Sequence, residues 1–89
     1  MNRRVIWRSR ATNDVRRMGA ENRARIAAAV NRLAATDEGD VVRLTARRPP
    51  QWRLRVGDYR ALFRFEAGAG DAAGSILIDR VLHRREAYR

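Results

Sequence analysis

Residues 52–66 read WRLRVGDYRALFRFE, and this stretch decides the fold. Apolar and basic side chains alternate on both sides of a Gly-Asp pair, which is the pattern of two half-buried strands joined by a tight turn. A two-residue loop with glycine in the first position favours a type II′ hairpin turn. The sequence therefore predicts an antiparallel hairpin with strands at 52–56 and 59–66.

The turn also determines which residues face each other across the hairpin. Val56 is expected opposite Tyr59 and Arg55 opposite Arg60, and alternation then separates the side chains by face. The face toward the helices takes Trp52, Leu54, Val56, Tyr59, Ala61, Phe63 and Phe65. The other face takes Arg53, Arg55, Arg60, Leu62, Arg64 and Glu66.

Facing arginines call for an explanation, because like charges directly across a strand pair repel. We expect no acid to neutralise them apart from Glu66, which lies at the far end of the hairpin. Guanidinium groups bind phosphate bidentately and stack on bases, so an anionic ligand between the arginines is one interpretation. The alternative is a solvated face that only keeps the protein soluble.

The overall charge favours the first interpretation. Twenty arginines and no lysine stand against ten acidic residues, which gives a formal net charge of +10 over 89 residues. Such a charge on one small domain (1–89) favours a polyanionic partner such as nucleic acid, with an acidic protein partner as an open alternative. A membrane surface is less favoured, because no helix places bulky apolar residues opposite its arginines.

Cysteine content and hydropathy indicate where the protein works. The chain has no cysteine, which fits a reducing compartment and predicts a cytoplasmic protein. No apolar run approaches the ~20 residues that span a bilayer. The start, MNRRVIWRSR, also lacks the apolar core of a signal peptide.

The first half of the chain predicts one strand and two helices. RVIWR at 4–8 is short, apolar and partly β-branched, as expected of a strand. Thr12 or Asn13 is expected to cap a helix that begins at Asp14. A longer helix should run from about Ala20 to Ala35 and end before Gly39, with a core-facing stripe of Ile26, Val30, Leu33 and Ala34.

The second half predicts strands. Val41–Leu44 is expected to be a connecting segment, and the prolines of RRPPQ make the next stretch an extended loop that carries Arg47 and Arg48. After the hairpin, 67–74 is a glycine-rich loop and SILIDRVLH at 75–83 a last, interior strand. The expected fold is α+β, with a mixed or antiparallel sheet of about four strands, two helices on one face and the order β-α-α-β-β-β.

The chain ends in HRREAYR, which holds its only histidine, His83. A single histidine without companion ligands is a poor metal site, and the carboxylates show no ligand spacing, so we expect neither a metal nor another cofactor. Tyr88 follows the pattern of a tail residue that packs on the sheet as well as that of a catalytic group.

Taken together, WRLRVGDYR and HRRE-x-Y resemble the RelE/ParE superfamily of type II toxins, on the RelE (mRNA interferase) side. The resemblance covers essentially the whole chain. It implies a toxin held inactive by a cognate acidic antitoxin, and cleavage of mRNA in the ribosomal A site. Because some members have lysine where this chain has Arg53 and Arg55, these two are expected to clamp phosphates and not to act as bases.

The resemblance also implies roles for individual residues. Arg60 and Arg84 match the positions that stabilise charge, while Tyr88 and His83 are the two candidates for moving a proton. RNA binding is assigned to Arg53, Arg55, Arg47, Arg48, Arg64 and Arg85. In metal-free cleavage the ribose 2′-OH attacks the adjacent phosphorus, so the protein supplies alignment, charge stabilisation and proton transfer only.

Two other functions are compatible with the same pattern. One is a ParE-like inhibitor of DNA gyrase that binds protein and cuts no RNA. The other is an inactive homologue that only binds RNA or an antitoxin.

Overall fold

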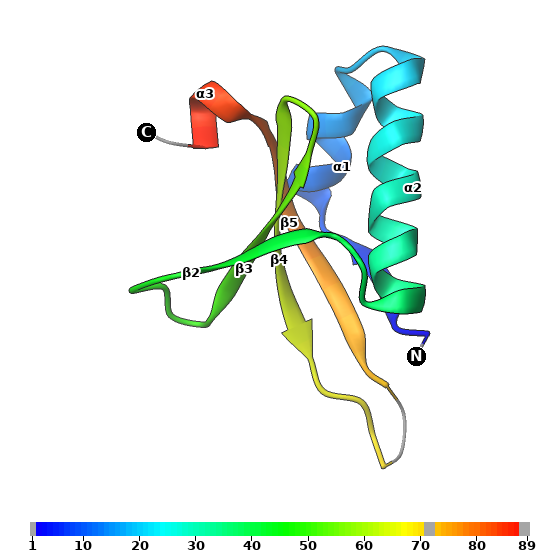
Figure 1. Ribbon diagram of the computed structural model, residues 1–89, viewed down its shortest axis with the longest axis vertical. Helices are drawn as coiled ribbons and strands as arrows, with labels where there is room; N and C mark the ends of the chain where they lie inside the picture. Colours follow the sequence, from blue (N-terminus) through cyan, green and yellow to red (C-terminus); the bar gives the residue numbers. More distant parts are fainter. Residues whose placement is uncertain (1, 71–72, 88–89) are drawn as a thin grey trace.

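The computed structural model describes residues 2–70 and 73–87. The elements follow the order β1 (Arg4–Trp7), α1 (Ser9–Arg16), α2 (Ala20–Thr36), β2 (Asp40–Leu44), β3 (Gln51–Val56), β4 (Tyr59–Glu66), β5 (Ser75–His83) and α3 (Arg84–Ala87). The sheet has the order β1-β5-β4-β3-β2, with β1 parallel to β5 and the remaining pairs antiparallel. Helices α1 and α2 lie on one side of this sheet, and α3 lies away from them at its hairpin end (Figure 1). The predicted α+β class and element order are confirmed.

The β3–β4 hairpin has the predicted register. Val56 pairs with Tyr59, Arg55 with Arg60, and Trp52 with Phe63. Gly57 takes a φ of 57°, the left-handed value that the first position of a type II′ turn requires. Leu54, Ala61 and Phe63 of the core-facing set are buried, and Trp52, Val56 and Tyr59 are partly buried against the core. Phe65 corrects the prediction, because it is 40% exposed at a position of β4 that lies beyond its pairing with β3.

Segment 40–44 corrects the prediction of a connecting segment, because it forms the edge strand β2 and brings the sheet to five strands. It pairs antiparallel with β3, so that Val41 lies beside Leu54 and Asp40 beside Arg55. Val41 packs against the core while Val42 is exposed, which is the alternation of an edge strand with one covered face.

The helix limits also differ from the prediction. Helix α1 begins at Ser9, earlier than the expected Asp14, because buried Ala11 and partly buried Val15 need to share one helical face toward the core. Helix α2 spans the predicted residues, with the predicted stripe buried. It ends at Thr36, and the C-cap residue Asp37 takes the left-handed conformation (φ 62°) that was expected of Gly39.

Asp14 joins α1 to the sheet. Its carboxylate accepts hydrogen bonds from the Arg80 guanidinium at 2.8 and 3.1 Å and from the Val81 backbone N–H at 2.9 Å. Burial raises the pKa of the Asp14 carboxyl, but these hydrogen bonds and the charges of Arg80 and Arg10 outweigh burial and hold the pKa below its ordinary value. The charged form of Asp14 therefore stabilises the packing of α1 on β5.

Removing this carboxylate should destabilise the fold. We expect Asp14→Ala to lower the free energy of unfolding by about 1–3 kcal/mol at neutral pH, because it leaves charged and backbone donors without an acceptor. The contribution is fully present above the ordinary pKa of 3.8 and is lost as the pH falls through the lower folded-state value. Urea titrations at neutral and acidic pH, with exposed Asp40→Ala as control, measure both effects. Equal losses for the two variants at neutral pH would contradict the role of Asp14.

Candidate functional site

The hairpin end of the open sheet face brings together residues from β3, β4 and α3. Arg55 pairs with Arg60 across β3 and β4, and Arg60 pairs with Leu82 across β4 and β5. Helix α3 begins directly after β5, and its first backbone N–H, from Arg84, donates to the Asp58 carbonyl at 2.7 Å. The Arg84 guanidinium also lies 3.8 Å from the Asp58 carboxylate. Thus Arg55, Arg60 and the start of the C-terminal segment share one end of the sheet.

Arg60 is buried, although it lies on the open face, with only 5% of its surface exposed. Its Nη1 donates to the carbonyl oxygens of Gly57 and Tyr59, both at 2.9 Å. The guanidinium therefore holds the hairpin turn in addition to placing a positive charge beneath the surface. An incoming phosphate would meet its field more readily than its Nη1 donors.

Arg53 and Arg55 lie on the surface of the same face. Arg55 is exposed and Arg53 half-buried. Asp40 on β2 lies opposite Arg55, so an acid that the sequence analysis did not place on this face adjoins the pair. Arg47, Arg48 and Arg85 are also exposed, the first two in the β2–β3 loop and the third in α3.

Arg64 departs from the expectation that only Glu66 neutralises these arginines. Its Nε and Nη2 donate to the two carboxylate oxygens of Asp79 at 2.7 and 2.8 Å. Asp79 has no partner residue on β4, because it lies at an irregularity of the β4–β5 ladder. Leu62 pairs there with Arg80 and Phe63 with Ile78. A bulge re-aims a side chain, and here it turns an acid toward Arg64 on the open face.

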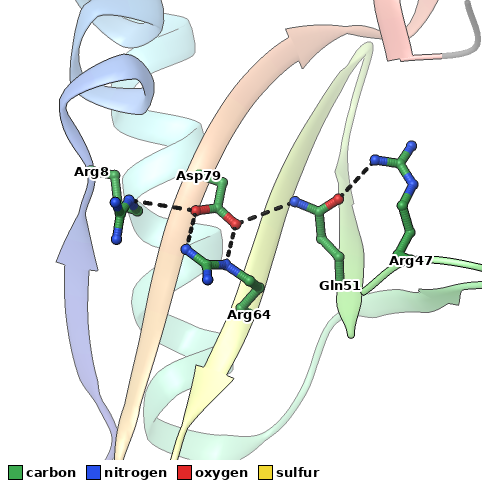
Figure 2. A network of polar contacts seen from close by, with 5 residues as sticks. All are labelled: Arg8, Arg47, Gln51, Arg64 and Asp79. Carbon is green, nitrogen blue, oxygen red and sulfur yellow. Dashed lines mark hydrogen bonds and ion pairs between the residues drawn. The ribbon is translucent and has the colours of Figure 1, made fainter. Parts of the chain in front are cut away.

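Asp79 is also the centre of a wider network. Its carboxylate lies 3.7 Å from the Arg8 guanidinium and accepts a hydrogen bond from the Gln51 side-chain amide at 3.2 Å. The side-chain carbonyl oxygen of Gln51 accepts in turn a hydrogen bond from the Arg47 guanidinium at 3.1 Å. Figure 2 shows this chain of contacts crossing the sheet from Arg8 to Arg47. Arg64 and Arg47, both predicted RNA ligands, are therefore fixed in one polar network.

Burial raises the pKa of the Asp79 carboxyl, but the hydrogen bonds from Arg64 and Gln51 and the charges of Arg64 and Arg8 hold it below its ordinary value. Asp79 is thus ionised at neutral pH.

His83 lies on the face toward the helices, opposite to that of Arg53, Arg55 and Arg60. It pairs with Tyr59, and the two rings meet edge to face with centroids 5.6 Å apart. Its Nδ1 accepts a hydrogen bond from the Arg85 backbone N–H at 3.3 Å, which leaves Nε2 to carry the proton of the neutral ring. Tyr88, the other predicted proton carrier, lies outside the described residues.

Within residues 2–70 and 73–87, no three His, Cys, Asp or Glu side chains are grouped so that they could hold a metal ion. Over the same residues, no helix is long and apolar enough to cross a membrane.

The sequence analysis did not single out Arg8, Asp79 or Arg80. The one available signal was the charged pair Asp79-Arg80 within the mostly apolar strand SILIDRVLH. An acid inside an interior strand is rarely left without a partner.

The environment of Arg60 predicts a loss of stability on substitution. We expect Arg60→Ala to lower the free energy of unfolding by about 1–3 kcal/mol, because two carbonyl groups of the turn lose a charged donor. Arg55→Ala, at an exposed position on the facing strand, should change it by less than about 0.5 kcal/mol. Urea denaturation of both variants provides the comparison. Equal effects would show that the Arg60 contacts do not support the turn.

Comparison with known proteins agrees with this fold. The sequence matches the family model described as the ParE toxin of the type II toxin–antitoxin system parDE, over residues 5–88. No protein with a curated description matches.

Three solved structures of toxin–antitoxin complexes contain similar chains. A chain of the RelB–RelE antitoxin–toxin complex from Methanococcus jannaschii is 22% identical to this chain in sequence. The match covers 93% of this chain and 94% of that one, with a TM-score of 0.67. The archaeal RelE–RelB complex from Pyrococcus horikoshii OT3 is 19% identical, covering 94% and 97%, with a TM-score of 0.70. The complex RelBE2 from Mycobacterium tuberculosis is 24% identical, covering 94% and 100%, with a TM-score of 0.69.

These likenesses show the RelE-like fold, and the family match extends over nearly the whole sequence. The chain belongs to the ParE toxin family, within the RelE/ParE superfamily, and is the toxin of a type II toxin–antitoxin system.

Proposed function

We propose that this toxin is a metal-free endoribonuclease that cleaves mRNA in the ribosomal A site. The observation that carries the proposal is the hairpin register, which brings Arg55 and Arg60 face to face and places α3 beside their turn. Arginines from two strands and the C-terminal segment then surround one end of the open face. That arrangement suits a phosphodiester, whose charge offsets the repulsion between them.

The reaction needs little from the protein. The ribose 2′-OH loses its proton and its oxygen forms a bond to the adjacent phosphorus, while the bond from phosphorus to the 5′ oxygen breaks. The products are a 2′,3′-cyclic phosphate and a 5′-OH that takes up a proton. Arg53 and Arg55 hold the flanking phosphates, and Arg84 stabilises the charge that develops on the phosphorane. Buried Arg60 adds positive potential and keeps the turn in place.

The position of His83 favours Tyr88 as the proton carrier. His83 lies on the helix side of the sheet, where its Nδ1 is already used by the Arg85 N–H. Tyr88 follows α3 directly in the sequence and belongs to the segment that begins beside the Asp58 turn. A tyrosine has an ordinary pKa of ~10, and a guanidinium close to a phenol favours the phenolate form.

An acidic antitoxin is the expected protein partner. The similar solved chains are in complexes of RelE with RelB, and the net charge of +10 favours a partner of opposite charge. Covering the arginines of the hairpin end would silence the toxin by excluding RNA.

A second candidate function is inhibition of DNA gyrase without RNA cleavage. The description of the matching family model as a ParE toxin favours it. In that case the same arginines would contact protein, and their loss would leave cellular RNA unaffected.

Substitution of Arg53 and Arg55 should impair cleavage without unfolding the protein. We expect the double variant Arg53→Ala/Arg55→Ala to lower the rate of mRNA cleavage by about 100-fold or more, because both flanking phosphates lose a ligand. Mapping of RNA 5′ ends after induction measures cleavage, and Arg23→Ala on the exposed surface of α2 is the control. Intact mRNA together with DNA breaks and SOS induction in cells making the wild type would overturn the proposal in favour of gyrase inhibition.

The proton carrier can be identified with two further variants. We expect Tyr88→Phe to lower the cleavage rate by about 10²–10⁴-fold, the usual contribution of a general acid or base. His83→Asn should change the rate less than tenfold. The dependence of the cleavage rate on pH should then show the ionisation of the proton carrier in the wild type and in His83→Asn, but not in Tyr88→Phe. The reverse order of effects would assign proton transfer to His83.

A further inference from the structure

A second electropositive site lies at the other end of the open face. A pocket of about 460 Å³ is bordered by the β1–α1 junction, α1, the β2–β3 loop, β3, β4 and β5. Five arginines line it, namely Arg8, Arg10, Arg47, Arg64 and Arg80. One aspartate, Asp79, is the only acid among the described lining residues.

The charges in this pocket do not cancel. Asp79 is shared by Arg64 and Arg8, and Asp14 outside the pocket accepts from Arg80. Two carboxylates, which contact three of the arginines, thus stand against five guanidinium groups, and this leaves an excess of three positive charges around the pocket. Solvated arginines tend to spread apart, whereas these converge from two strands, the start of a helix with the residue before it, and a loop.

The arginines are also held in place. The chain Asp79–Gln51–Arg47 fixes the Arg47 guanidinium by a hydrogen bond at 3.1 Å, and Arg64 is fixed by its bidentate pair with Asp79 (Figure 2). Guanidinium groups fixed by the protein lose less conformational entropy when they bind an anion. The network therefore preorganises the pocket as well as stabilising it.

The start of α1 adds to the positive potential. Ser9 and Arg10, its first two residues, line the pocket. The N-cap residue Arg8 makes no side-chain capping hydrogen bond, and the first turn contains no acid. Helix N-termini with these features favour anions.

The pocket lies on the same face as the hairpin end. Leu62 and Arg64 line it, and both alternate onto the face of Arg60. Arg64 is four residues beyond Arg60 on β4, roughly 13 Å away at ~3.3 Å per residue. Arg53, which pairs with Leu62, lies between the two ends. A single extended strand of nucleic acid can run along this line.

We propose that the pocket is a second phosphate-binding site, which holds the RNA strand several nucleotides away from the bond that is cut. The inference rests on the proposed function, since it takes the same RNA as its ligand. Phosphate is favoured over a carboxylate because the pocket offers several planar forks to one anion, and phosphate presents more acceptor oxygens than a carboxylate.

The test compares two double variants of equal charge. Arg10→Ala/Arg47→Ala removes two pocket arginines that make no contact with Asp79, and Arg16→Ala/Arg23→Ala removes two exposed arginines from the helices. The probes are a 2′-O-methyl dodecanucleotide, which cannot be cleaved, and a 2′-O-methyl trinucleotide, which is too short to reach both ends of the face. Affinity is measured as a function of salt concentration, and circular dichroism verifies folding.

For the dodecanucleotide we expect the pocket variant to bind about tenfold more weakly at low salt. The slope of log affinity against log salt should fall by about 0.7, since the pocket holds one phosphate and each lost phosphate contact on a single strand accounts for ~0.7. The slopes of the control variant should match the wild type. The trinucleotide should not distinguish the variants.

Equal slopes for the pocket and control variants would overturn the inference. So would a loss of binding to an oligoglutamate peptide with RNA binding unchanged, which would assign the pocket to an acidic protein. Absence of RNA cleavage by the wild type would overturn the proposed nuclease alone, because the slopes are measured with probes that are not cut.

Discussion

The two-residue turn at Gly57-Asp58 is the constraint on which the rest of the structure depends. Because the loop has only two residues, the strands on either side can pair in one register only. That register buries Leu54, Ala61 and Phe63 and keeps the arginines on the open face. A slip by one residue would exchange the two sets. The protein strengthens the turn from within, because Arg60 donates to two of its carbonyl groups. The residue that looks most like a ligand for RNA is therefore also a structural element of the hairpin.

A single aspartate organises the other end of the same face. Asp79 occupies a bulge in β5 and gathers Arg64, Arg8 and, through Gln51, Arg47. Without a carboxylate at this point, Arg8 between β1 and α1, Arg64 on β4 and Arg47 in the β2–β3 loop would repel one another. The open face is consequently not a uniform positive surface. It has a hairpin end close to α3 and a pocket end at α1, joined by Arg53.

This division bears on how a small toxin of the RelE/ParE superfamily can act on a large polyanion. RNA cleavage by the 2′-OH takes its nucleophile from the substrate, so alignment and charge stabilisation dominate what the protein contributes. One cluster of guanidinium groups can stabilise the reacting phosphate, and a distant one can set the path of the strand. Under the proposed function, the same positive field would attract an acidic antitoxin, and a partner that covered the hairpin end would compete directly with RNA.

The sequence by itself determined the hairpin register, the long helix with its buried stripe, the α+β class and the resemblance to this superfamily, because those features follow from short-range periodicity and turn chemistry. Sequence reasoning placed α1 too late and missed β2, since buried Ala11 and the pairing of Val41 with Leu54 are long-range packing effects. Only the tertiary structure decided which arginines are neutralised. Asp14 meets Arg80 and Asp79 meets Arg64 through folding of distant segments and a bulge in β5, and neither local propensity nor alternation encodes such contacts.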